Sequence, residues 1–147
     1  MDERLGALIA RFRAAGCRNA ESWASSEIAE GIPQFARFIF LQNLRRLVTA
    51  EGSREWLRRL ALPNDDGRGG IRRRLTESSA TIEDLTELVR AAQAEVVRGV
   101  AYLLDGYLPG GELVKEVQWG LYELDAESNP ARSIDGLHES IDDEDVR

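Results

Sequence analysis

Residues 81–105, TIEDLTELVRAAQAEVVRGVAYLLD, are the stretch that decides the fold class. Thr81 is a good helix N-cap, and Glu83 and Asp84 follow in the first turn, where the helix dipole favours acidic side chains. Apolar side chains then recur every three or four residues, which predicts a long amphipathic helix with one buried face. These side chains are Ile82, Leu85, Val89, Ala92, Val96 and Leu103.

A second long helix is predicted over residues 33–51, PQFARFIFLQNLRRLVTAE. Its apolar side chains cover much of the circumference, which is typical of a helix at the centre of a bundle. Shorter helices are predicted over residues 2–15, 19–30 and 53–62, with Asn19 as an N-cap and with Gly16, Gly31 and Gly52 as breaks. We therefore expect a mainly α fold, a bundle of about four to six helices over residues 2–106. The predicted core side chains are Trp23, Phe35, Phe38, Ile39, Leu85, Val89, Val96 and Trp119.

The hydrophobic period changes after residue 111. Apolar Val117, Trp119 and Leu121 alternate with other residues, and period two predicts a strand. The turn-forming stretch DAESNPAR (residues 125–132) and a return strand over residues 132–134 would complete a small β-hairpin. A helix over residues 112–119 stays open as an alternative. The hairpin and an acidic C-terminal segment then occupy residues 112–147, within one domain that covers residues 1–147.

Charge is distributed unevenly along the chain. Residues 1–75 hold 14 basic and 9 acidic groups, whereas residues 76–147 hold 5 basic and 17 acidic groups, so the net charge of −7 hides two halves of opposite sign. Complementary potentials steer association and fix register, so we predict a charge-polarised interaction surface. Its candidate residues are Arg45, Arg46, Arg58, Arg59, Arg72, Arg73, Asp142, Asp143, Glu144 and Asp145.

The single histidine, His138, lies in the C-terminal stretch SIDGLHESIDDEDVR (residues 133–147). A metal site would have to combine it with Glu139 and Asp135, because the chain offers no second histidine and no CxxC pair. We favour a histidine in a turn at Gly136, followed by an acidic terminus that is solvated or docks on the protein's own arginines. If it docks, deletion of residues 135–147 should lower the stability, and the loss should shrink at high salt. No cofactor is expected.

The composition also limits the class of protein. The chain shows neither a signal peptide nor an apolar run of the length that crosses a membrane, and the single Cys17 fits a reducing compartment, so we expect a cytoplasmic protein. No local signature of nucleophilic or acid–base catalysis is present. We therefore expect a small interaction or regulatory protein without catalysis, which binds a protein partner or itself, for example as a homodimer. The alternatives are a metal-dependent enzyme that uses His138 and a nucleic-acid binder that uses the arginine face. The acidic net charge argues against the second of these.

Overall fold

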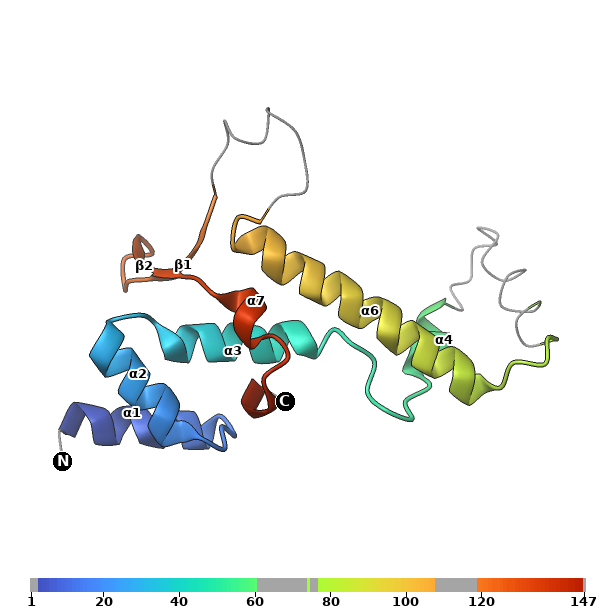
Figure 1. Ribbon diagram of the computed structural model, residues 1–147, viewed down its shortest axis with the longest axis horizontal. Coiled ribbons are helices and arrows are strands. Elements are labelled where there is room, and N and C mark those ends of the chain that lie inside the picture. The colour runs from blue at the N-terminus through green and yellow to red at the C-terminus, as the bar shows by residue number, and fades with distance from the viewer. Residues whose placement is uncertain (1–2, 61–73, 75–76, 108–118, 147) are drawn as a thin grey trace. The chain divides into compact units, whose positions relative to one another are not determined.

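The computed structural model describes residues 3–60, 74, 77–107 and 119–146, and it is mainly helical with one small antiparallel hairpin (Figure 1). This confirms the predicted fold class. The elements are α1 (Glu3–Ala14), α2 (Ala20–Glu30), α3 (Gln34–Arg45), α4 (Glu55–Leu60), α6 (Ile82–Leu104), β1 (Leu121–Leu124), β2 (Pro130–Ile134), α7 (Leu137–Ser140) and the 3-10 helix η2 (Glu144–Val146).

The chain divides into two compact units. The first consists of Met1–Arg45 together with Arg98–Arg147, and the second is Arg46–Val97. The second unit is thus inserted into the sequence of the first. One domain over residues 1–147 stays a prediction.

The first unit is built around aromatic side chains from α1, α2 and α3. Phe12 and Phe38 are fully buried, and Trp23 is 9% exposed. Their rings meet edge to face or tilted, with centroids 5.6 Å apart for Phe12–Phe38 and 5.4 Å for Trp23–Phe38. Such pairs contribute about 0.5–1.5 kcal/mol each beyond their buried area. The predicted core positions Trp23 and Phe38 are confirmed, whereas Phe35 and Ile39 are partly exposed.

The ends of the helices follow local chemistry in part. Gly31 adopts the left-handed conformation (φ 71°) after α2, as its predicted role as a helix end requires. The predicted helix over residues 33–51 is too long, because α3 ends at Arg45. Within the second unit, the backbone N–H of Thr49 donates to the Gln93 side chain and the Thr49 carbonyl accepts from Arg90. These side chains replace the bonds that a continued helix would have made.

The hairpin pairs β1 with β2, with Leu121 opposite Ile134. The turn between the strands is closed by Asp125, whose carboxylate accepts the backbone N–H groups of Asn129 and Glu127. These bonds, first that from Asn129, lower the pKa of Asp125. The hairpin is therefore confirmed from Leu121 onward, and the predicted strand position Val117 lies outside the described residues.

Arg132 forms one ion pair within the hairpin, with Glu123 of β1, and one with a helix of the first unit, with Glu27 of α2. Arg132 lies 2.7 Å from a carboxylate oxygen of Glu123 and 3.1 Å from one of Glu27. Glu27 is only 6% exposed and also accepts the backbone N–H of Phe35. Because a buried carboxylate needs partners, Glu27 links α2, the start of α3 and β2 at one point.

In the second unit, α4 packs against the first half of α6. Trp56 is 7% exposed, and its indole N–H donates to Thr86 Oγ1 at 3.0 Å. The predicted cap of α6 is confirmed, because Thr81 Oγ1 accepts the N–H of Asp84 while the Asp84 carboxylate accepts the N–H of Thr81.

The buried face of α6 is not the one predicted. Leu85 is buried as expected, but Val96 is 67% exposed and Leu88 is 66% exposed. The side chains that α6 buries instead include Thr86, Val97 and Ala101, on the neighbouring face of the same helix. Tertiary contacts such as the Trp56–Thr86 bond select that face, and the apolar period alone could not.

Candidate functional site

The C-terminal segment, residues 135–146, packs on the helices of the first unit. Leu137 and Val146 are fully buried and Ile141 is 3% exposed, and α7 and η2 both contact α3 (Figure 1). Burial of a side chain of this size contributes about 1.5–3 kcal/mol. The prediction of a solvated acidic tail is therefore wrong, because apolar residues spaced among the acidic ones anchor the segment.

Asp145 is buried although it was predicted to lie on an interaction surface. Its carboxylate accepts from the Asn19 side chain at 2.7 Å and from the Trp23 indole at 3.3 Å, and it is 6% exposed. Asn19 occupies the N-cap position of α2, but its side chain makes no capping bond, because it binds Asp145. Burial first, and then the charge of Asp145, raise the pKa of the Cys17 thiol to about 11.

Arg37 holds the other end of the same segment. Its guanidinium donates to the Gly136 carbonyl and to Ser140 Oγ, and Glu139 lies 4.0 Å away. Arg37 is 9% exposed, and burial lowers its pKa. Arg37 was not among the residues predicted from the sequence. Its position within the apolar run of α3 was nevertheless a signal, because a buried arginine needs a hydrogen-bond or charged partner.

His138 pairs with Asp105 across 33 residues of sequence. The Asp105 carboxyl oxygen Oδ2 lies 2.6 Å from His138 Nδ1 and accepts the His138 backbone N–H at 2.8 Å. The Asp105 side chain is 3% exposed and the His138 side chain is 18% exposed. This arrangement fixes the imidazole ring and holds the turn at Gly136, which adopts the left-handed conformation (φ 70°).

The predicted metal trio is not assembled around His138. Asp135 accepts a hydrogen bond from Ser133, and Glu139 is 70% exposed. Among the residues that the structure describes, no three histidine, cysteine or acidic side chains lie close enough together to hold a metal ion. Asp105, which does meet His138, was not among the predicted ligands.

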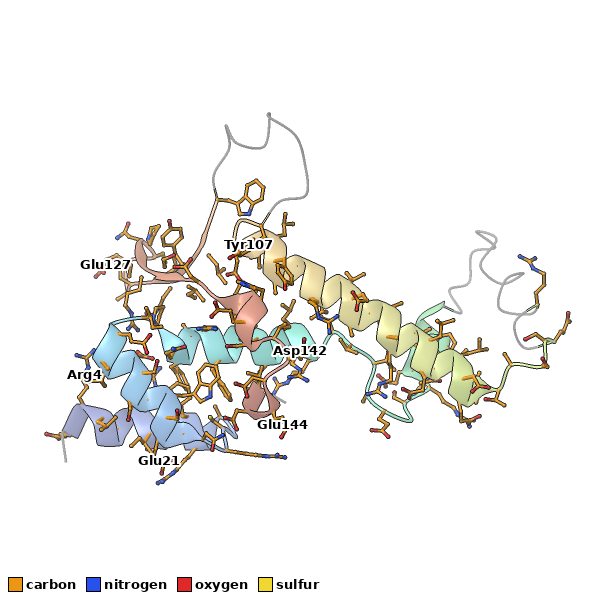
Figure 2. All side chains as sticks on the ribbon, in the orientation of Figure 1. Arg4, Glu21, Tyr107, Glu127, Asp142 and Glu144 are labelled. Carbon is orange, nitrogen blue, oxygen red and sulfur yellow. The ribbon has the colours of Figure 1, made fainter. Side chains whose placement is uncertain are left out.

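An aromatic surface adjoins His138 at the end of α6, where Figure 2 labels Tyr107. Gly106 is left-handed (φ 81°), its N–H donates to the Leu103 carbonyl, and the N–H of Tyr107 donates to the Tyr102 carbonyl. This is a Schellman motif, which returns the chain so that the side chains on either side of the cap touch. The rings of Tyr102 and Tyr107 accordingly lie 5.8 Å apart and contact His138 at 4.8 and 4.7 Å.

Trp119 belongs to the same surface. Its indole N–H donates to the Leu103 carbonyl at 2.8 Å, and its side chain is 43% exposed. The prediction that Trp119 lies in the core is therefore wrong. Its side chain is partly exposed and binds the last turn of α6. We call Tyr102, Leu103, Tyr107 and Trp119 the aromatic patch.

The structure describes only some of the remaining predicted interaction residues. Arg45 donates to the Asp143 carbonyl and Arg98 pairs with Asp142, so part of the acidic segment contacts the protein's own arginines. Arg46, Arg58, Asp143 and Glu144 are exposed. Arg72, Arg73 and the side chain of Arg59 lie outside the described part of the chain.

No family model matches the chain, and comparisons with curated proteins and with solved structures find no match either. Of the helices that the structure describes, none has both the length and the apolarity needed to cross a membrane.

Proposed function

We propose that this protein is a non-catalytic interaction module that binds a basic protein partner through its first unit. The supporting observation is the location of the charge. The first unit, Met1–Arg45 with Arg98–Arg147, holds 10 basic and 17 acidic residues, whereas Arg46–Val97 holds nine of each. The whole net charge of −7 therefore belongs to the first unit, which we call the acidic unit.

Several carboxylates of the acidic unit face solvent. Glu139 and Asp142 are each 70% exposed, and Asp143, Glu144 and Glu127 are exposed as well. A surface of one sign attracts partners of the opposite sign and speeds their encounter. Its effect on affinity decreases with salt, because exposed charges are screened beyond about 8 Å at physiological ionic strength.

The Asp105–His138 pair has a structural role in this proposal. Asp105 accepts both the backbone N–H and the ring Nδ1 of His138, so the pair holds the segment that carries the exposed acids Glu139 and Asp142. A nucleic-acid partner fits less well, because phosphates are repelled by the acidic unit and the arginines Arg54 and Arg58 of the second unit pair with Glu83 and Glu55. A cytoplasmic location is part of the proposal and is supported by the single Cys17.

The test is affinity capture from a cell extract at low and at high salt, followed by identification of the bound protein. It compares the unmodified protein with a variant that neutralises exposed acids of the acidic unit and with a control that neutralises as many acids in Arg46–Val97. The variant carries Glu139→Gln, Asp142→Asn and Glu144→Gln, and the control carries Glu51→Gln, Glu55→Gln and Glu77→Gln.

We expect a basic partner that is retained at low salt by the unmodified protein and the control, and that is lost from the acidic-unit variant. Sedimentation of the purified protein at both salt concentrations separates this outcome from self-association. A captured partner that binds the acidic-unit variant as tightly as the unmodified protein contradicts the proposal, as does capture that is insensitive to salt.

A further inference from the structure

The aromatic patch gathers four large apolar side chains that are all partly exposed. The exposed fractions are 41% for Tyr102, 43% for Leu103, 57% for Tyr107 and 43% for Trp119. Contiguous exposed apolar surface is typical of a binding site, and tyrosine and tryptophan are the residue types that most often dominate binding energy. We infer that the aromatic patch is the docking site for an arginine-rich segment of a protein partner. This inference rests on the proposed function and names the place where the partner binds.

The rings of the patch are ordered before any partner arrives. Tyr102 and Tyr107 contact each other and His138, and His138 is fixed in turn by buried Asp105. Trp119 is fixed by its bond to the Leu103 carbonyl. Ordering a free side chain at an interface costs about 0.5–1.5 kcal/mol, and this cost is small where the rings are already held.

Exposed acidic groups belong to the same unit as these rings. Glu139 follows His138 directly in α7, and Asp142 pairs with Arg98 of α6 at 3.2 Å. A guanidinium group stacks on aromatic rings and forms paired hydrogen bonds with carboxylates, so exposed rings on an acidic unit suit arginine. The protein uses the same contact internally, since the Arg11 guanidinium lies 4.1 Å from the centre of the Phe35 ring.

Other occupants fit the charge less well. Membrane surfaces and nucleic acids are anionic and would be repelled by an acidic unit of net charge −7. The same patch of a second copy would carry the same charge. An arginine-rich protein segment gains from both the rings and the acids.

The test uses three synthetic peptides of equal length in which leucine alternates with arginine, with lysine or with glutamate. Affinities for the full chain are measured by isothermal titration calorimetry. We expect the arginine peptide to bind more tightly than the lysine peptide, no binding of the glutamate peptide, and weaker binding as salt increases. Equal binding of the arginine and glutamate peptides overturns the inference.

Two tyrosine variants locate the binding site. Tyr107→Ala removes a ring of the patch, and Tyr122→Ala removes a tyrosine of similar exposure (47%) from β1 as a control. We expect Tyr107→Ala to weaken the arginine peptide about tenfold and Tyr122→Ala to leave the affinity unchanged. Circular dichroism and thermal unfolding of both variants confirm that they are folded. Equal effects of the two variants overturn the inference.

The same titrations separate this inference from the proposed function. If Glu139→Gln weakens the arginine peptide while Tyr107→Ala does not, the acidic interaction module stands and docking on the aromatic patch is refuted. If the arginine peptide does not bind the unmodified protein, docking on the patch is likewise refuted. The proposed function then depends on affinity capture alone, where the absence of any salt-sensitive basic partner would remove it too.

Discussion

Asp145 gives the sharpest test of how the C-terminal segment docks. Asp145→Ala removes the acceptor of two hydrogen bonds, at 2.7 Å from Asn19 and 3.3 Å from the Trp23 indole. A hydrogen bond to a charged group contributes about 1.5–3 kcal/mol, and a buried donor left without a partner costs about 1–3 kcal/mol. Because the bond to Trp23 is long and the two effects overlap, we expect a loss of about 2–3 kcal/mol in the free energy of unfolding.

The measurement is urea unfolding, followed by circular dichroism and by tryptophan fluorescence. Glu144→Ala is the matched control, since Glu144 is the adjacent acidic residue and is exposed. Substitutions at such positions usually change the stability by less than about 0.5 kcal/mol. Asp145→Asn should give an intermediate loss because it keeps one acceptor. If Asp145→Ala is no more destabilising than Glu144→Ala, the buried carboxylate does not hold the segment.

Three further predictions follow from the same contacts. Deletion of residues 135–147 should lower the stability, and most of the loss should persist at high salt because Leu137, Ile141 and Val146 anchor the segment by apolar burial. Unfolding at two salt concentrations measures the loss, and a loss that disappears at high salt contradicts this prediction. The Cys17 thiol, with its pKa raised to about 11 from 9.0, should react slowly with Ellman's reagent in the folded protein and faster in Asp145→Asn. The folded state holds the Cys17 proton more tightly than the unfolded state, so the protonated thiol contributes its full share of the stability below pH 9. This share is lost as the pH rises through 11. A free energy of unfolding that does not fall between these pH values contradicts the raised pKa. Gly99→Ala should stabilise the protein by up to about 1 kcal/mol, since Gly99 is helical and nothing lies within 4 Å of an added Cβ. Gly106→Ala should destabilise the protein by about 1–2 kcal/mol, because φ is 81° at this position. Thermal unfolding measures both changes, and changes of the same sign refute the backbone argument.

The parts of the fold that sequence could predict are those set by neighbouring residues. The Thr81–Asp84 cap, the glycine end of α2 and the hairpin turn at Asp125 each depend on groups within a few positions of each other. The apolar period of α6 predicted the helix for the same reason. The face that α6 buries depends on its contact with Trp56 of α4. The apolar period of α6 contains no information about this contact between two helices.

The candidate site was harder to predict because its pairs are distant in sequence. Asp105 meets His138 across 33 residues, and Arg37 meets Ser140 across 103. One local signal existed: Asp105 directly follows the C-terminal end of α6, where the helix dipole disfavours an acidic group, so a specific partner was to be expected. The C-terminal stretch holds six acidic groups, but its position is determined by the buried apolar side chains Leu137, Ile141 and Val146.

The insertion of one unit into the sequence of the other has a consequence for synthesis. The contact that joins Asn19 to Asp145 spans 126 positions, so it forms only after the whole inserted unit has been synthesised. On the ribosome, α1–α3 emerge long before residues 137–146, which pack on α3. The second unit, Arg46–Val97, is one continuous segment and is synthesised before those residues. We expect the inserted unit to fold first and the nascent α3 to need protection from aggregation until residues 137–146 have been translated.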